Sequence, residues 1–373
     1  MTDTSTASAA GAADTSARVL RVGIIGAGGI ATGAHIPGYQ KTEGAELYAV
    51  CDVIEERAKA MGEQYGIAHV FTDYQQMLKL PELDVVSVCT PPFAHKEATI
   101  AALQAGKHVL CEKPMALDGD EAQAMLDAWY KSREKHHNKL TIGFQSRYGR
   151  RAQLLKRFIQ AGELGEIYYG RAAALRRRGV PGWGVFTSKA KNGGGPLIDI
   201  GVHALDLALW LMGHPQPASV YGVTYHKFGN RPNVFNPWGP WDPKTYDVED
   251  AAFAMIRFRN GATLQLECSW ALNIERSMSQ TILCGTEGGA QLDPFKLFQE
   301  KHGTILDVAP PERATEGQGR QGESGHTLEI QSFIQAIRED RDPLVLPEQA
   351  LMVSRIIDAI YASDESGDSV QLT

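Results

Sequence analysis

A glycine-rich loop between a short apolar strand and a helix constrains the fold of this chain more than any other feature. Residues Arg21 to Ile25 predict the strand, and the run Gly26-Ala27-Gly28-Gly29-Ile30-Ala31 follows at once in the form G-x-G-x-x-A. In this pattern the first glycine makes a tight turn, the second lets the backbone approach a pyrophosphate, and the last small residue lets the helix pack closely. The helix N-terminus then faces the phosphate charge. The loop therefore predicts a dinucleotide-binding unit.

Strand and helix patterns alternate through the first part of the chain, up to about residue 146. Short apolar strands are expected at 46–51, 85–89, 108–111 and 140–144, with helical patterns over 55–65, 96–105 and 121–135 between them. This alternation indicates an α/β fold with a doubly wound parallel sheet. Ligands of such sheets bind at the carboxyl ends of the strands, which here carry Thr90-Pro91-Pro92 and Glu112-Lys113-Pro114.

The pattern changes after about residue 147. An amphipathic helix is expected over 150–160, and longer strand-like runs follow at 218–224, 251–259, 262–270 and 280–284. Asn260-Gly261 stands between two of these runs and is a strong hairpin signal. This pattern is typical of an antiparallel sheet in an α+β domain. Residues 310–325 are expected to form a loop, and 326–339 and 347–363 to form helices that pack back onto the first domain.

We therefore expect three parts in the chain. Residues 1–18 read as a disordered tail, because from Thr2 to Ser16 they contain only Thr, Ala, Ser, Asp and Gly and lack the features of a secretion signal. Residues 19–146 are expected to bind the dinucleotide, and residues 147–373 to form an α+β domain for substrate binding and oligomer formation. No apolar run approaches the ~18 residues that span a bilayer, so a cytoplasmic protein without membrane contacts is expected.

Charge and cysteine content narrow the range of partners. The formal net charge of −7 argues against nucleic acid or an anionic membrane as the main partner. The five cysteines include no CxxC pair, so neither a disulfide framework nor a metal site is expected.

The residue that ends the second expected strand indicates which dinucleotide binds. Asp52 lies 21 positions after Ala31, the spacing of a carboxylate that binds the ribose. Such a carboxylate accepts a hydrogen bond from the 2′-hydroxyl and repels a 2′-phosphate. No basic pair follows it directly, and Arg57 fits on the next helix. The sequence therefore favours NAD over NADP.

A second informative feature is a helix that is apolar almost all round, from Gly195 to Trp210, which predicts burial. It nevertheless carries Asp199, His203 and Asp206. Asp199 and His203 are four residues apart, so on an α-helix they share one face. Buried ionisable groups are costly unless they are paired. The two side chains are therefore either a structural pair or a carboxylate that orients an imidazole general base.

These features together resemble the Gfo/Idh/MocA family, the glucose–fructose oxidoreductase and inositol dehydrogenase group. The resemblance rests on Val22–Ala31, Cys111–Met115 and Asp199–His203, and it extends from Val19 to the C-terminus. It implies a Rossmann domain followed by a large open antiparallel sheet, one face of which often packs against another subunit. A homo-oligomer, dimer or tetramer, is therefore expected. In this family the lysine of the E-K-P motif and the acid and histidine of the D-x-G-x-H helix form the catalytic centre.

A narrower likeness concerns residues 176–186, 193–199 and 238–243, which look like the branch that oxidises sugars and glycosides at the C3 hydroxyl. The implied reaction is hydride transfer from that carbon to NAD. Neighbouring branches imply two alternatives, an inositol dehydrogenase or a keto-sugar reductase. Two further alternatives are an NAD-dependent glycosidase that oxidises C3 transiently and a ligand-sensing regulatory protein.

The resemblance also implies the site residues. The catalytic centre is expected to comprise Lys113, Asp199 and His203, with Asp199 orienting His203, and which of Lys113 and His203 is the base stays open. Substrate contacts are expected from these three together with Arg147 and Trp183. The loop 228–246 is either a substrate lid or a contact with a neighbouring subunit. The expected cofactor contacts are Gly26, Gly28, Gly29, Ile30, Asp52, Thr90, Pro91, His95, Glu112, Lys113 and Gln145.

Overall fold

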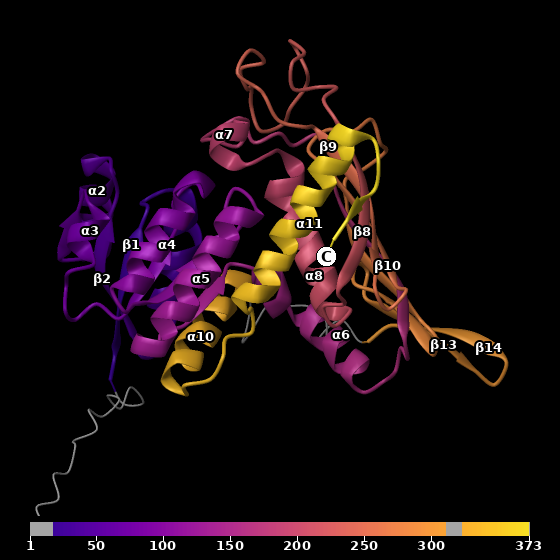
Figure 1. Cartoon of the computed structure of the whole chain (residues 1–373), viewed down its shortest axis with the longest axis horizontal. Helices are drawn as coiled ribbons and strands as arrows, with labels where there is room; N and C mark the ends of the chain where they lie inside the picture. The colour runs from indigo at the N-terminus through magenta and orange to yellow at the C-terminus, as the bar shows by residue number, and fades with distance from the viewer. Residues whose placement is uncertain (1–17, 311–322, 373) are drawn as a thin grey trace, which may run out of the picture.

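The computed structural model describes residues 18–310 and 323–372, which are built around two sheets (Figure 1). The predicted tail, apart from Arg18, and most of the predicted loop 310–325 lie outside the described residues. The first sheet has six parallel strands in the order β3-β2-β1-β4-β5-β6. Its strands are β1 (Leu20–Ile25), β2 (Ala45–Cys51), β3 (His69–Phe71), β4 (Val85–Val88), β5 (His108–Cys111) and β6 (Leu140–Ile142). The central strands are continuous apolar runs because helices cover both faces.

Helices connect these strands and end where the sequence places a cap or a glycine. Asp118 accepts a hydrogen bond from the backbone N–H of Glu121 at the start of α5, and Gly66 ends α2 in the left-handed region with φ of 67°. The helical elements are η1 (Ala31–His35), α1 (Ile36–Gln40), α2 (Glu55–Tyr65), α3 (Tyr74–Met77), η2 (Pro92–Ala94), α4 (His95–Gln104), α5 (Gly119–His136) and η3 (Gln145–Tyr148).

The second sheet has nine strands in the order β14-β13-β12-β11-β7-β10-β9-β8-β15. The predicted hairpin at Asn260-Gly261 joins β9 to β10. The sheet is mixed rather than wholly antiparallel, because β7 is followed by a helical crossover and pairs in parallel with β10. The strands are β7 (Ile167–Leu175), β8 (Pro217–Tyr225), β9 (Ala251–Phe258), β10 (Thr263–Ser269), β11 (Met278–Gly285), β12 (Gly288–Gln291), β13 (Lys296–Lys301), β14 (Thr304–Val308) and β15 (Val370–Gln371).

Helices cover one face of this second sheet and bind it to the first. The remaining helices are α6 (Arg150–Gln160), α7 (Lys189–Asn192), η4 (Leu197–Gly201), α8 (Val202–Leu211), α10 (Gly325–Arg338) and α11 (Pro347–Ser366). Helix α11 packs against both β8 and α5, and α8 packs against β7 (Figure 1). Helix α10 inserts Ile330, Phe333 and Ile337 into the same apolar core as Val22 and Ile24 of β1.

The segment Lys189–Leu211 combines α7, η4 and α8. By length and composition it could cross a membrane, and it is the one such segment among the described residues. Its apolar window is 72% buried inside the protein, as expected for the core helix of a globular fold.

Candidate active site

The glycine loop after β1 leaves open space for a ligand. Gly26 has φ of 99°, and a Cβ atom there would lie 2.7 Å from the carbonyl oxygen of Cys89 at the end of β4. Only glycine fits this turn without strain. Apart from the adjoining backbone, no atom of the described residues lies within 4 Å of the Cβ position at Gly28 or Gly29, just before the η1 helical segment. The loop therefore makes a tight turn on its inner side and offers bare backbone on its outer side.

Asp52 is held against this loop from the end of β2. Its Oδ2 accepts a hydrogen bond from the backbone N–H of Ala27 at 2.7 Å, and its Oδ1 accepts one from Ile54 at 2.9 Å. A carboxylate oxygen can accept a second hydrogen bond, so the group remains available to a hydroxyl donor. The predicted spacing therefore places a fixed carboxylate beside the exposed glycine backbone.

Lys113 and Asp199 form an ion pair between the two parts of the chain. The Lys113 Nζ donates to the backbone oxygen of Asp199 at 2.9 Å and to its Oδ1 at 3.1 Å. The Asp199 Oδ2 accepts from the indole N–H of Trp270 at 3.0 Å and lies 3.6 Å from Arg176. Burial opposes ionisation of Asp199, but the charges of Lys113 and Arg176 outweigh it and lower the pKa of the carboxyl.

The prediction that Asp199 orients His203 is wrong. The helix begins with a π turn, η4, which carries Asp199, and regular α-helix starts only at Val202. A π turn is wider than an α turn, so residues four apart no longer stand directly above one another. Both oxygens of Asp199 point to Lys113 and Trp270 instead.

His203 lies near Lys113 and Asp199, and no carboxylate binds it among the described residues. Its Nδ1 is buried and accepts or donates no hydrogen bond within the described part of the chain. Its ring lies nearly perpendicular to that of Phe144, at a centroid distance of 6.5 Å. Burial, and next the charge of Lys113, lower the pKa of His203 to about 3. The imidazole is therefore neutral at neutral pH and carries one free acceptor nitrogen.

A cleft of about 410 Å³ opens beside His203 between the end of β6 and the second sheet. Three buried polar atoms in this region have no partner among the described residues: Thr90 Oγ1, Gln145 Oε1 and His203 Nδ1. A buried polar atom without a partner costs about 1–3 kcal/mol, so a bound ligand that supplied partners would be favoured. The cleft is lined by Gln145, Ser146, Ala173, Ala174, Leu175, Arg176, Ile200, His203, Ala204, Leu207, Ser277, Met278, Ser279 and Thr281.

Comparison with known proteins decides the family. Residues 20–144 match the model of the NAD-binding Rossmann fold of the GFO_IDH_MocA oxidoreductase family, and residues 156–372 match that family's C-terminal alpha/beta domain. The chain belongs to the Gfo/Idh/MocA family. Among curated proteins, D-glucoside 3-dehydrogenase of Escherichia coli (strain K12) is 40% identical over 95% of this chain and 97% of its own length.

Solved structures agree with this assignment. Levoglucosan dehydrogenase in complex with NADH and levoglucosan has a TM-score of 0.80 and 25% identity, covering 94% of this chain and 99% of that one. Aldose-aldose oxidoreductase from Caulobacter crescentus has a TM-score of 0.78 and 27% identity, covering 95% of this chain and all of its own. The chain therefore has an NAD-binding Gfo/Idh/MocA fold, and its open glycine loop, Asp52 and the unpartnered Thr90 hydroxyl fit a dinucleotide.

We predict that Asp52→Ser will weaken the use of NAD. A hydrogen bond to a charged group contributes about 1.5–3 kcal/mol, so kcat/KM for NAD should fall roughly 10- to 100-fold while the value for NADP falls much less. The measurement is initial rates with both cofactors. Asp118→Ser removes a similar carboxylate from the N-terminus of α5 and serves as the control. An unchanged ratio of NAD to NADP use would contradict the role of Asp52.

Glu112 and His95 are buried side chains that support the loops after β4 and β5 of this Gfo/Idh/MocA chain. The Glu112 Oε1 lies 2.8 Å from Nε2 of buried His35, and despite burial this bond and the charges nearby lower the pKa of Glu112 to about 2. The prediction that His95 contacts the cofactor is wrong, because its side chain is fully buried. Its ring nitrogens each lie 2.8 Å from a backbone oxygen, of Thr90 and of Pro114. His95 thereby ties together the loops that follow β4 and β5.

His326 is a site residue that the sequence analysis missed. It stands in the first turn of α10, where the neighbouring Gly325 would bring a Cβ atom within 3.0 Å of the Gln145 backbone oxygen. Burial lowers the pKa of His326, and the charge of Glu112 opposes this shift. A histidine at the start of a helix was the one signal in the sequence, because only the tertiary packing of α10 brings His326 here.

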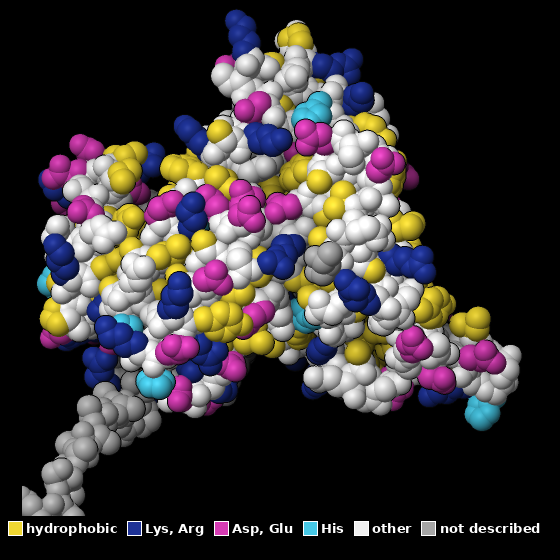
Figure 2. Space-filling view, viewed as in Figure 1, with side chains coloured by type: hydrophobic (Ala, Val, Ile, Leu, Met, Phe, Trp, Pro, Cys, Tyr) yellow, Lys and Arg dark blue, Asp and Glu magenta, His cyan; other side chains and the backbone are white. Residues whose placement is uncertain are grey.

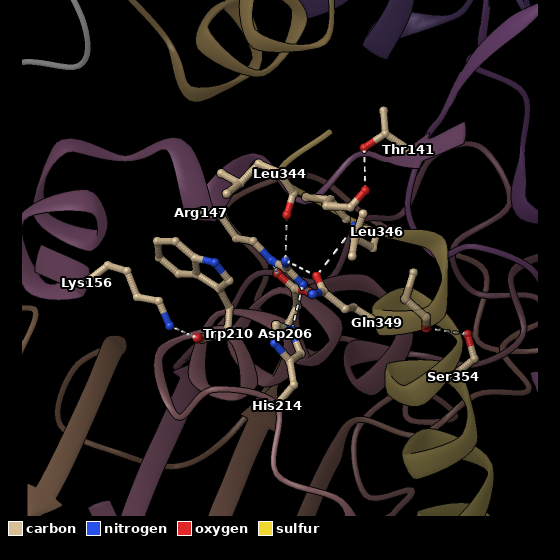
Figure 3. Close-up of polar contacts among 12 residues, drawn as sticks. Thr141, Arg147, Lys156, Asp206, Trp210, His214, Leu344, Leu346, Gln349 and Ser354 are labelled. Atoms are coloured by element: carbon tan, nitrogen blue, oxygen red, sulfur yellow. Dashed lines mark hydrogen bonds and ion pairs between the residues drawn. The ribbon is translucent and has the colours of Figure 1, made fainter. Parts of the chain in front are cut away.

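The prediction that Arg147 contacts the substrate is also wrong. Its side chain is fully buried and binds Asp206 of α8 through Nε at 2.9 Å and Nη2 at 2.6 Å (Figure 3). Its Nη1 also donates to Gln349 of α11 at 2.5 Å and to the Leu344 backbone oxygen at 3.3 Å. Arg147 thus joins η3, α8 and α11, far along the chain from one another.

Breaking this ion pair should cost stability rather than chemistry. We expect Asp206→Asn to lower the free energy of unfolding by about 3–5 kcal/mol, because it leaves the Arg147 charge buried without a counter-charge. Equilibrium denaturation measures the loss. Glu339→Gln breaks an exposed pair with Arg341 and should cost less than about 1 kcal/mol. A comparable small loss for Asp206→Asn would show that the buried pair is not required.

Two consecutive buried acids hold the site in place. Glu249 accepts hydrogen bonds from the backbone N–H groups of Gly195 at 2.9 Å and Leu197 at 3.1 Å, at the start of the helical segment η4. Asp250 accepts from three consecutive N–H groups in the loop after β8, those of Lys227, Phe228 and Gly229. One acid therefore fixes the helix that carries Asp199 and His203, and the next fixes the loop beside it.

Trp183 lies on the surface rather than in the core, with 55% of the residue exposed. Its ring meets Trp238 of the loop between β8 and β9 at a centroid distance of 5.8 Å. That loop rises above the sheet at the top of the molecule (Figure 1).

Proposed function

We propose that this chain is an NAD-dependent dehydrogenase that oxidises the C3 hydroxyl of a glucoside to a ketone. The observation that carries the proposal is the Lys113–Asp199 ion pair standing in one site with the partly buried, neutral His203, whose Nδ1 has no hydrogen-bond partner among the described residues. The name of the E. coli relative, D-glucoside 3-dehydrogenase, supports the substrate class and the reacting carbon.

In this proposal NAD, when bound, accepts the hydrogen of C3 together with its electron pair. Lys113 positions the hydroxyl oxygen: two N–H groups of its ammonium are used by Asp199, which leaves the third for the substrate. That donor stabilises negative charge on the oxygen as the C–H bond breaks. Asp199 keeps the ammonium in place and balances its charge.

The hydroxyl proton passes to the free ring nitrogen of His203. A neutral imidazole is needed for this step, and burial together with the Lys113 charge keeps His203 neutral. The C3 carbon becomes a carbonyl, and His203 then releases the proton to solvent. Two N–H groups of Lys113 are held by Asp199, so in this proposal His203 rather than Lys113 is the base.

A homo-oligomer is part of the same proposal. On the face of the second sheet away from the helices, Tyr221 of β8 stands opposite Met255 of β9, and both are about half exposed. Light scattering on the purified protein tests whether copies associate through this face, and a monomer would remove this part of the proposal.

The experiment is NADH formation, followed by absorbance, with methyl β-D-glucoside, glucose and myo-inositol, each with NAD and NADP. We expect turnover of the glucoside with NAD. Turnover of inositol alone would identify an inositol dehydrogenase instead. Release of aglycone without NADH would indicate a glycosidase that recycles its cofactor, and NAD binding without turnover would indicate a regulatory protein.

A further inference from the structure

A cluster of exposed aromatic side chains stands on the loop that follows β7 and the loop between β8 and β9. Trp183 and Trp238 are 55% and 46% exposed, with ring planes tilted by 50°. Phe186 meets the other side of the cluster, 6.2 Å from Trp183 and nearly perpendicular to it. Figure 2 shows hydrophobic and basic side chains side by side on the loops that project there. Two large indole faces left partly in water are costly unless something covers them.

The cluster is continuous with the catalytic cleft through one side chain. Arg176 lines the cleft, and its Nη1 lies 3.6 Å from the Asp199 carboxylate. The guanidinium of the same residue stacks over Trp238 at 4.7 Å from the ring centroid. The aromatic surface therefore begins where the site for the reacting sugar ring ends.

Hydrogen bonds hold the loops that carry these rings in place. The Asn236 side chain accepts a hydrogen bond from the backbone N–H of Val180 and donates to the backbone oxygens of Val180 and Gly239. Its bonds to Val180 join the two loops. The Trp241 indole donates to the Gly229 oxygen at 2.7 Å, within the stretch that Asp250 holds. A fixed pair of rings can bind a flat ligand without a large ordering cost.

The chemistry of the cluster favours an aromatic group over a second sugar. Sugar sites combine an aromatic platform with free polar side chains, but both amide hydrogens of Asn236 are already used within the loops. Guanidinium groups stack on the rings of this region: Arg176 lies over Trp238, and Arg178 lies over Phe228 at 4.6 Å. Such groups attract the electron-rich face of an aryl ring.

We propose that Trp183 and Trp238 form a subsite for the aromatic aglycone of an aryl glycoside, whose sugar ring lies against Lys113 and His203. This inference rests on the proposed function and narrows its substrate class. Offset or edge contacts between aromatic rings add roughly two- to tenfold in affinity each, so losing one indole should be measurable.

The test compares kcat/KM for 4-nitrophenyl β-D-glucoside and methyl β-D-glucoside in the wild-type protein, Trp183→Ala and Trp238→Phe. We expect the aryl-to-methyl ratio to fall roughly tenfold in Trp183→Ala and by a smaller factor in Trp238→Phe, which keeps a smaller ring under Arg176. Phe235→Ala is the matched control, because Phe235 is 74% exposed in the same loop and should leave the ratio unchanged. Thermal unfolding checks that each variant is folded.

Three results would overturn the subsite. An unchanged ratio in both tryptophan variants would show that the rings do not bind the aglycone. An unchanged ratio together with a smaller oligomer in Trp183→Ala would assign the cluster to a subunit interface. If kcat/KM for cellobiose, tested in parallel, fell in the tryptophan variants as much as kcat/KM for the aryl glucoside, the cluster would be assigned to a second sugar. Turnover of neither glucoside by the wild-type protein would instead remove the proposed function itself.

Discussion

Replacing His203 with alanine should lower kcat by roughly 10²–10⁴-fold while changing the dissociation constant of NADH by less than about threefold. The imidazole is the neutral acceptor in the proposed proton transfer, and nothing else in the described cleft duplicates it. Its ring meets Phe144, and the substitution leaves the glycine loop and Asp52 unchanged, so NADH binding should persist. Steady-state kinetics and calorimetric titration with NADH measure the two effects, and equal losses in both would contradict the assignment.

The pH dependence of the wild-type protein follows from the same residue. Burial and the Lys113 charge lower the pKa of His203 to about 3, so the ring stays neutral as pH falls through the ordinary histidine range. The acid limb of kcat should therefore lie below about pH 5 rather than near 6.5. An acid limb near 6.5 that disappears in His203→Gln would show that the imidazole titrates in the ordinary way.

Replacing Lys113 with methionine should lower kcat by roughly 10²–10³-fold, the usual loss when one donor to a developing oxyanion is removed. Methionine keeps the length of the side chain but donates no hydrogen bond, and among the described residues it leaves the Asp199 carboxylate with Trp270 and Arg176. NADH binding should again persist within a few-fold. Lys113→Arg should recover little of the loss, because a planar guanidinium cannot reproduce the ammonium geometry.

Controls separate this effect from a general loss of positive charge or of folding. Lys59→Met removes an exposed lysine paired with Glu55 on α2 and should leave kcat unchanged. Both variants are checked by thermal unfolding. If Lys113→Met retained most of its turnover, the hydroxyl would have to be positioned by another donor.

The parts of this site that the sequence could predict depend on local rules. The loop Gly26–Ala31 and Asp52 were predictable because a strand, a tight turn and a helix N-terminus follow one another within a single βαβ unit. The position of Lys113 was predictable for a similar reason, since the carboxyl ends of neighbouring parallel strands meet at one edge of the sheet.

The other parts depend on contacts between distant segments or on an irregular backbone. The prediction that Asp199 orients His203 was wrong because a π turn changes the spacing of residues along the helix. The sequence does not reveal this turn. Arg147 was assigned to the substrate through the family resemblance, but Asp206, 59 residues later, binds it instead. His326, Glu249 and Asp250 reach the site only through the packing of α10 and the strand β9.

The most direct test of the proposed reaction is the fate of the hydrogen on C3. Methyl β-D-glucoside carrying deuterium at C3 is incubated with the wild-type protein and NAD, and the products are examined by NMR and mass spectrometry. We expect the deuterium in the reduced cofactor and a 3-keto sugar without the label. Reduced cofactor without deuterium, with the label still on the sugar, would show that another carbon is oxidised and would contradict the account.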